Sequence, residues 1–330
     1  MITRRDFMGG TAAAMVAGTS VPARAAGLRH RLGLSQPADS PNCIRLKEMA
    51  ERVATDTNGA LAIEVFPESK LGSDSAMIEM VRRGELELYL GGNVFGPLVP
   101  VTEMPGLPFT FRDSAAVFEA LDGDLGDHIR GALAAKGLRA FRYGMDNGFH
   151  QLTTSMRPIR TVADLQGMKI RTPVQKMTVE FFETLGAKPM TFTLNKLYEV
   201  CRDKVVDGQT DPLAIVVLLK LYEVQTYLSL TNHWWSGFTL VANEGAWNAL
   251  PADVRAVVDR HAETAAREQR KDIARIDAGA VELLKARGMI VNEADTRGFR
   301  KPLAEFYARW KGIYGERAWA LLEARVGKLA

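Results

Sequence analysis

Cysteine and histidine are scarce in this sequence, which has two cysteines and five histidines among 330 residues. The histidines are scattered and no C-x-x-C pair occurs, so we expect no metal site of the usual zinc spacing. Cys43 and Cys201 could form one disulfide in an oxidising compartment. They fall in separate predicted helices far apart in the sequence, and spacing alone does not establish a bridge, so two buried free thiols are the preferred interpretation.

Motifs of the common enzyme classes are also missing. No G-x-G-x-x-G follows a predicted strand, and the sequence has no Walker loop, no G-x-S-x-G and no H-E-x-x-H. The glycine-rich stretch "LGGNVFGP", residues 90–97, lacks the lysine of a phosphate-binding loop. We therefore expect a protein without cofactor that is not an enzyme. A secreted enzyme whose catalytic residues are scattered along the sequence remains the alternative.

Long apolar runs and charge blocks are absent as well. Outside the first 25 residues no run of about 18 uncharged apolar residues occurs, so no retained membrane span is expected. The net charge is +3, without a long basic block or an RNA-binding motif. Nucleic acid is accordingly not an expected partner.

The first 25 residues have the three regions of an export signal in order. Arg4 and Arg5 precede a weakly apolar stretch, and the small residues around Arg24 suit a signal peptidase. This order predicts a twin-arginine-type signal peptide over residues 1–25 and a periplasmic location. The alternative is an irregular N-terminus with a chance pair of arginines.

From residue 28 onward, short apolar runs alternate with helical patterns. Expected strands cover 28–34, 60–66 and 86–92; expected helices cover 40–57 and 73–84. The first helix should begin at Ser40 and Pro41, and the second should run from a Ser73 cap to Gly84. The apolar stripe of the first helix comprises Ile44, Leu46, Met49, Ala50 and Val53. This alternation predicts an α/β fold with largely parallel strands.

Residues 251–287 form the longest helical pattern. It follows Pro251, contains a single glycine, Gly279, and ends before Gly288. An unbroken helix of that length would measure roughly 55 Å, which is longer than a typical domain is wide, so it should lie across two lobes. The alternative is two helices separated near Gly279, because an interior glycine weakens a helix.

The stretch "GMKIRTP", residues 167–173, places an arginine at the end of an apolar strand. Thr172 should be extended because it precedes Pro173, and Pro173 suits the start of a helix, so Arg171 lies at the carboxyl end of the strand. Asp211 ends "VVDGQTDP" in the same way, before Pro212 and an apolar helix expected over 213–223. In open α/β sheets this edge faces the ligand crevice. The alternatives are a surface charge for Arg171 and a helix N-cap for Asp211.

These motifs in this order resemble the solute-binding proteins of tripartite ATP-independent periplasmic (TRAP) transporters. The resemblance rests on 167–173, "LGAKPMTFTLNKLYEV" (185–200), "VVDGQTDP" (205–212) and "TNH" (231–233), and it extends over about 28–290. It implies a two-lobed periplasmic-binding-protein-like fold with a ligand cleft between the domains and a long helix that spans both. The protein would capture a small carboxylate and deliver it, as a monomer, to the small and large membrane subunits of a permease. A sensor kinase as receiver is the alternative.

The resemblance also assigns domain limits. Domain I would comprise residues 26–148 plus about 237–270, and domain II residues 149–236 plus about 271–330. The chain would cross between the lobes at 143–149 and 233–238, where Gly144, Gly148 and Gly237 permit hinge motion.

In this family an arginine at the position of Arg171 grips the ligand carboxylate. A guanidinium offers a planar fork that suits this task. The sequence departs from the family at His150, where many relatives carry a second arginine, and at Asp211, where relatives usually carry asparagine. Both changes favour a monocarboxylate with a bulky, even aromatic, body over a dicarboxylate. The other candidate ligand-binding residues are Trp234, Trp235 and Asn93; at least one of the two tryptophans should serve packing.

Overall fold

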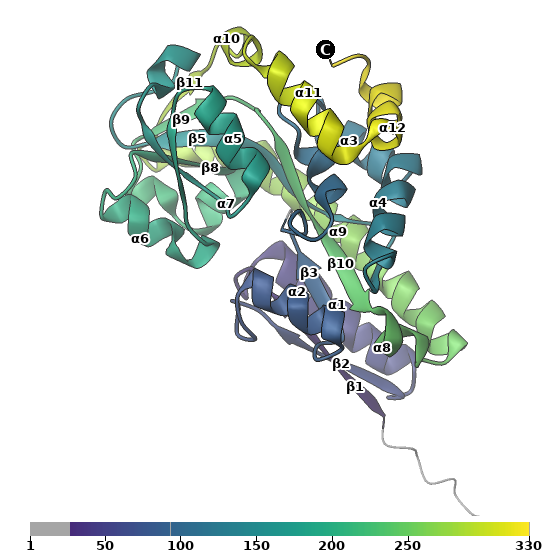
Figure 1. Ribbon diagram of the computed structural model, residues 1–330. Helices are drawn as coiled ribbons and strands as arrows, with labels where there is room; N and C mark the ends of the chain where they lie inside the picture. The colour runs from purple at the N-terminus through teal and green to yellow at the C-terminus, as the bar shows by residue number, and fades with distance from the viewer. Residues whose placement is uncertain (1–26, 93, 330) are drawn as a thin grey trace, which may run out of the picture.

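The computed structural model describes residues 27–92 and 94–329, and Figure 1 shows two lobes joined by long elements that run through both. The predicted signal peptide therefore lies outside the described residues. The strands are β1 Leu28–Leu34, β2 Leu61–Phe66, β3 Leu88–Gly91, β4 Leu138–Ala140, β5 Met145–Thr154, β6 Lys169–Thr172, β7 Lys188–Thr191, β8 Gly208–Pro212, β9 Tyr227–Leu230, β10 Trp235–Asn243 and β11 Ile290–Glu293.

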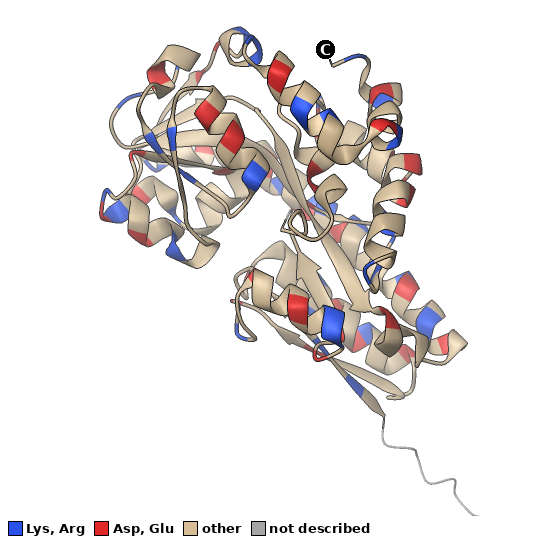
Figure 2. Ribbon diagram, viewed as in Figure 1, with Lys and Arg blue, Asp and Glu red and all other residues tan. Residues whose placement is uncertain are grey.

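The α-helices surround the strands, and α10, α11 and α12 follow the last strand at the C-terminal end of the chain. They are α1 Pro41–Asp56, α2 Asp74–Arg83, α3 Ser114–Leu121, α4 Asp124–Ala134, α5 Lys176–Thr184, α6 Leu197–Arg202, α7 Leu213–Leu218, α8 Glu244–Asn248, α9 Ala252–Ala286, α10 Arg297–Arg300, α11 Leu303–Tyr314 and α12 Glu316–Val326. Lys and Arg are interspersed with Asp and Glu on the helices of both lobes (Figure 2). No helix of the described residues is long and apolar enough to cross a membrane.

The first lobe is built as the strand and helix patterns predict. Strands β1, β2 and β3 are parallel, and β10 joins them antiparallel to β3. The Ser40 hydroxyl caps α1, the Ser73 hydroxyl caps α2, and Gly84 ends α2 with a left-handed φ of 76°. One position of the α1 stripe was predicted wrongly. Ile44 is 44 % exposed, because the buried face of α1 passes through Asn42 and Cys43 instead.

The second lobe carries β6 between β7 and β8, all three parallel, with β5 antiparallel to β8. β5 and β10 pair with each other, and this pair joins the sheet of one lobe to that of the other. The register shifts between Ser236 and Gly237, and Gly148 has a φ of 104°, so the crossing strands are irregular where the lobes meet. Both features fall within the two segments predicted to cross.

The long helix α9 is continuous through Gly279 for 35 residues, about 52 Å at the usual rise. Val254, Val258 and Ala262 pack into the core of the first lobe, whereas Ala280 and Leu284 pack into that of the second. The single unbroken helix is thus confirmed, and the alternative of two helices is wrong. Because α9 packs into the cores of both lobes, it connects the two lobes along one continuous helix.

Two smaller expectations need correction. α5 begins at Lys176 with Gln175 as its N-cap, so Pro173 lies before the helix, in a short turn where the Gln175 N–H donates to the Pro173 carbonyl at 2.8 Å. The helix after Pro212 ends at Leu218, because the chain turns through Lys220 at a φ of 51°. The preferred interpretation of the cysteines is confirmed, since Cys43 and Cys201 are both free and buried.

Candidate functional site

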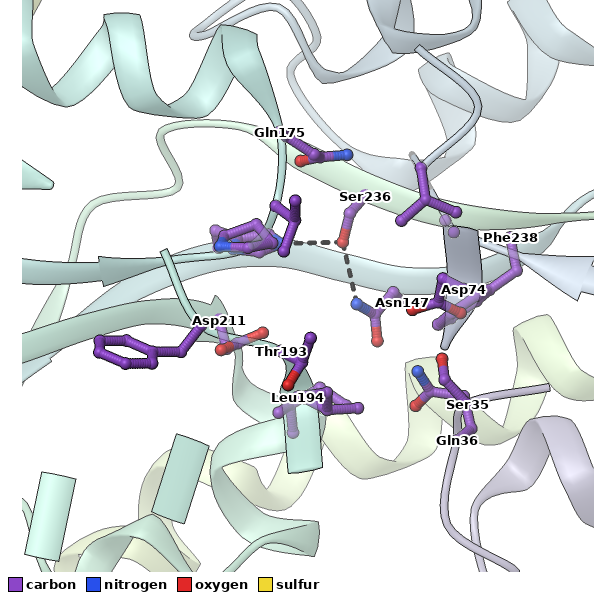
Figure 3. Close-up of a pocket in the computed structure, with 18 of the residues that line it drawn as sticks. Ser35, Gln36, Asp74, Asn147, Gln175, Thr193, Leu194, Asp211, Ser236 and Phe238 are labelled. Atoms are coloured by element: carbon purple, nitrogen blue, oxygen red, sulfur yellow. Dashed lines mark hydrogen bonds between the residues drawn. The ribbon is translucent and has the colours of Figure 1, made fainter. Parts of the chain in front are cut away.

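A cavity of about 170 Å³ lies between the lobes, and both contribute to its walls (Figure 3). Its polar lining from the first lobe is Ser35, Gln36, Ser73, Asp74 and Ser75. From the second lobe and the crossing strands come Asn147, His150, Arg171, Gln175, Thr193, Asp211 and Ser236. Apolar walls are supplied by residues such as Phe192, Leu194, Trp234 and Phe238. A ligand held here would contact both lobes at once.

Arg171 enters this cavity from the end of β6, as the strand-end position predicts. Its side chain is only 2 % exposed. Nε and one terminal nitrogen both donate to the Phe192 carbonyl, at 3.0 and 2.8 Å, and the other terminal nitrogen donates to Asp211 Oδ2 at 2.8 Å. A guanidinium has five N–H groups, so one remains undonated on each terminal nitrogen among the described residues. That is the number a two-oxygen carboxylate contact requires.

Asp211 reaches the same point from β8, which is hydrogen-bonded to β6. It does not cap the helix that follows, because the N-cap of α7 is Pro212 and no side chain caps that helix. Burial raises the pKa of Asp211 to about 6, although the neighbouring Arg171 guanidinium pulls it down. Arg171 and Asp211 therefore form a buried ion pair that lines the cavity.

His150 lines the cavity as a neutral ring within a hydrogen-bonded network. Its Nδ1 lies 3.0 Å from Thr210 Oγ1 and its Nε2 lies 2.8 Å from Ser236 Oγ, which also accepts from Asn147 at 2.9 Å. Burial, the nearby His233 and Arg171 all hold the pKa of His150 well below its ordinary value. Burial also lowers the pKa of His233 to about 3. His150 thus supplies no positive charge at neutral pH in place of the second arginine that many relatives carry.

The two tryptophans have different positions. Trp234 lines the cavity, donates from Nε1 to Thr210 Oγ1 at 3.3 Å, and packs against His150 with ring centroids 3.9 Å apart and the rings tilted by 32°. Trp235 lies outside the lining of this cavity, packed edge-to-face on Phe118 and donating to Asp146 Oδ1 at 2.8 Å. The expectation that Trp235 lines the ligand site is therefore not supported. Asn93 lies outside the described residues.

Sequence reasoning missed the wall that the first lobe contributes. Asp74 follows the Ser73 cap of α2 directly and accepts a hydrogen bond from the Tyr89 hydroxyl at 2.7 Å. Gln36 comes just after β1, at the carboxyl end of a parallel strand. The strand-end argument applied to Arg171 would have identified Gln36, but nothing in the local pattern distinguishes Asp74 from an ordinary first-turn carboxylate.

Arg171 is the only lysine or arginine among the described residues that line the cavity, whereas Asp74 and Asp211 are both acidic. The Arg171 guanidinium is a permanent cation, whereas the Asp74 and Asp211 carboxylates carry negative charge when ionised. With His150 neutral, the described lining offers one positively charged group, Arg171, and no second one.

Comparison with known proteins identifies the family to which this fold belongs. Residues 32–312 match the family described as bacterial extracellular solute-binding protein, family 7. The chain belongs to this family. Among the solved structures, the chain is similar to a TRAP periplasmic solute-binding protein from Polaromonas sp. JS666 bound to D-erythronate. That structure has a TM-score of 0.84 and 30% identity, and the match covers 89% of this chain and 98% of that one.

Two curated relatives are named for different carboxylate ligands. The 2,3-diketo-L-gulonate-binding periplasmic protein YiaO of Escherichia coli K12 is 32% identical over 83% of this chain and 84% of its own length. The C4-dicarboxylate-binding periplasmic protein DctP of Rhodobacter capsulatus is 29% identical over 95% and 92%, respectively. Family membership therefore establishes a two-lobed solute-binding protein of the TRAP type and leaves the ligand open between these kinds.

Proposed function

We propose that this protein captures a hydroxylated monocarboxylate in the periplasm and delivers it to the small and large membrane subunits of a TRAP permease. The observation that carries the proposal is the pair of undonated N–H groups that Arg171 keeps inside a cavity with no second lysine or arginine among its described lining residues. The D-erythronate and diketogulonate named for relatives are hydroxylated acids of this kind.

The body of the ligand follows from the rest of the lining. Serine hydroxyls and amides from both lobes, among them Ser35, Gln36 and Asn147, offer partners to ligand hydroxyls. The aromatic body expected from the sequence loses support, since Trp235 is elsewhere and one face of Trp234 is covered by His150. Trp234 and Phe238 supply apolar walls for the carbon skeleton.

Export by the twin-arginine route and action as a monomer belong to the same proposal, as do the two domains at the predicted limits. Support for the limits comes from the pairing of β5 with β10 between the lobes. The proposed function includes no catalytic step, because the captured solute is bound and released unchanged.

A thermal-shift panel tests the ligand class. D-Gluconate and D-erythronate should raise the melting temperature of the purified protein, because a ligand that binds only the folded state stabilises it by mass action. Succinate and L-malate should have a smaller effect, since their second carboxylate would meet Asp74 or Asp211. The neutral sugar alcohols D-glucitol and erythritol are the matched controls. If succinate or malate gave the larger shift, the monocarboxylate proposal would be wrong.

Closure of the lobes on the ligand is a separate expectation. Gly148, with its φ of 104°, and the irregular register at Gly237 lie where the chain crosses between the lobes. Small rotations at these points would close the cleft while α9 stays intact. Small-angle scattering should show a lower radius of gyration with saturating ligand than without it. Superimposable profiles, measured at a concentration where calorimetry proves saturation, would contradict hinge closure.

A further inference from the structure

We infer that Asp211 determines specificity at the ligand's second carbon, selecting carboxylates that carry a hydrogen-bond donor there over their 2-oxo and 2-deoxy analogues. The inference rests on the proposed function, because it requires a carboxylate on Arg171. It goes further by stating which neighbouring group the carboxylate must bring with it.

The first step is the free oxygen of Asp211. Oδ2 accepts from Arg171 at 2.8 Å, whereas Oδ1 accepts no hydrogen bond from the described residues. Oδ1 is also not among the buried atoms that lack a partner, and the Asp211 side chain keeps 8% of its surface accessible. Since Asp211 lines the cavity, this accessible oxygen faces it, and Figure 3 shows the carboxylate directed to the cavity interior.

The second step is the pattern that the pair presents. Arg171 offers two undonated N–H groups, and beside them Asp211 offers one unused acceptor. A 2-hydroxy or 2-ammonium carboxylate has the complementary pattern, with two acceptor oxygens and a donor one carbon away. A 2-oxo acid would direct a carbonyl oxygen at the Asp211 carboxylate. A 2-deoxy acid would leave that buried acceptor without water or partner, which is costly.

The third step is electrostatic. A bound carboxylate places two negative groups on one guanidinium, and such a pair is relieved either by a shared donor or by a proton. The titratable groups around Asp211 are Arg171 from β6, His150 from β5 and Cys201 from α6. His150 is neutral, and burial raises the pKa of the Cys201 thiol to about 12, so neither adds charge at neutral pH. The relief must come from the ligand's own donor or from protonation of Asp211.

A consequence for pH follows with a definite sign. Burial raises the pKa of Asp211 to about 6, so the free protein carries an ionised Asp211 at pH 8 and a largely protonated one at pH 5. A ligand without a donor must bind together with a proton, and its affinity should fall by up to tenfold per pH unit above about 6. A 2-hydroxy acid supplies its own hydrogen, so its affinity should depend on pH much less.

The test uses a matched six-carbon series in titration calorimetry: D-gluconate, 2-amino-2-deoxy-D-gluconate, 2-keto-D-gluconate and 2-deoxy-D-gluconate. At pH 8 the first two should bind wild-type protein at least tenfold more tightly than the last two. At pH 5 the difference in log Kd between D-gluconate and 2-deoxy-D-gluconate should be less than half of the difference measured at pH 8. The pH comparison is made on the wild-type protein and needs no variant.

Asp211→Asn then isolates the residue. The amide can donate as well as accept, so the variant should bind the 2-keto and 2-deoxy acids at least fivefold more tightly than wild type at pH 8, and its affinities should no longer depend on pH in this range. Asp203→Asn, which neutralises an exposed aspartate paired with Arg202, is the matched control and should reproduce the wild-type values.

The outcomes distinguish failure of the specificity inference from failure of the proposed function. If the four acids bind wild-type protein equally at pH 8, or if Asp211→Asn keeps the wild-type preference, the specificity inference is overturned while carboxylate capture stands. If none of the four, nor D-erythronate and its 2-deoxy analogue, binds either protein at either pH, then capture of a hydroxylated monocarboxylate is overturned and the inference with it.

Discussion

Arg171→Ala should weaken binding of the cognate acid by ten- to a hundredfold or more, measured by titration calorimetry. A charge-assisted hydrogen bond contributes about 1.5–3 kcal/mol, and the guanidinium has one undonated N–H on each terminal nitrogen for the ligand. Arg171→Lys should recover only part of the affinity, because a single ammonium cannot hold both the Phe192 carbonyl and Asp211 and still present a fork. Unchanged affinity in the alanine variant would rule out Arg171 as the carboxylate anchor.

The same substitution should also cost stability. An arginine that only contacts the ligand could be removed without loss of stability, but the structure pairs Arg171 with a buried Asp211. Removing one partner of a buried pair typically costs about 3–5 kcal/mol, because the other charge stays buried. The double variant Arg171→Ala/Asp211→Asn should regain much of that loss in urea unfolding and still bind poorly. Restoration of both stability and affinity in the double variant would contradict the separation of the two roles.

Trp235→Ala is expected to have a similarly large effect on stability, lowering the free energy of unfolding by about 3–5 kcal/mol. The indole is 3% exposed, packs edge-to-face on Phe118 at 5.7 Å, and satisfies the buried Asp146 carboxylate. Truncation would leave both a cavity and an unpaired acceptor at the crossing strand β10. Urea unfolding followed by circular dichroism measures the loss.

Trp235→Phe is the control, since it keeps most of the apolar volume and loses only the hydrogen bond to Asp146, a cost of about 1 kcal/mol. At temperatures where Trp235→Ala is folded, its affinity for the ligand should stay within threefold of wild type, because Trp235 does not line the cavity. A loss of affinity as large as that of Arg171→Ala would show that Trp235 contributes to the ligand site.

The sequence predicted best where one local rule decides the outcome. Ser40 and Ser73 cap their helices because their hydroxyls reach an amide three residues on, and this requires no knowledge of the rest of the chain. Arg171 could be placed in a cleft because the end of a parallel strand before a proline has few other positions to take. The continuity of α9 through Gly279 was predicted from a helical pattern over many turns, which outweighed the single interior glycine.

Sequence reasoning left alternatives open, or missed a residue, where contacts between distant segments decide the outcome. Whether Asp211 caps α7 or pairs with Arg171 depends on β8 lying beside β6, and no local pattern records that neighbour. Trp234 and Trp235 are adjacent in sequence, yet at the start of β10 one side chain lines the cavity and the other packs on Phe118. Asp74 reaches the cavity only because the lobes face each other. In each case the decisive contact joins residues far apart in the chain.

Native mass spectrometry of the full-length protein, exported and purified from a periplasmic extract, tests the central claim most directly. The account holds that a small acid is bound between the lobes through Arg171. Wild-type protein should carry a co-purified compound with one carboxylate, and Arg171→Ala, prepared in parallel, should carry at least tenfold less of it. A bound compound without a carboxylate, or the same acid retained to the same extent by Arg171→Ala, would contradict the account.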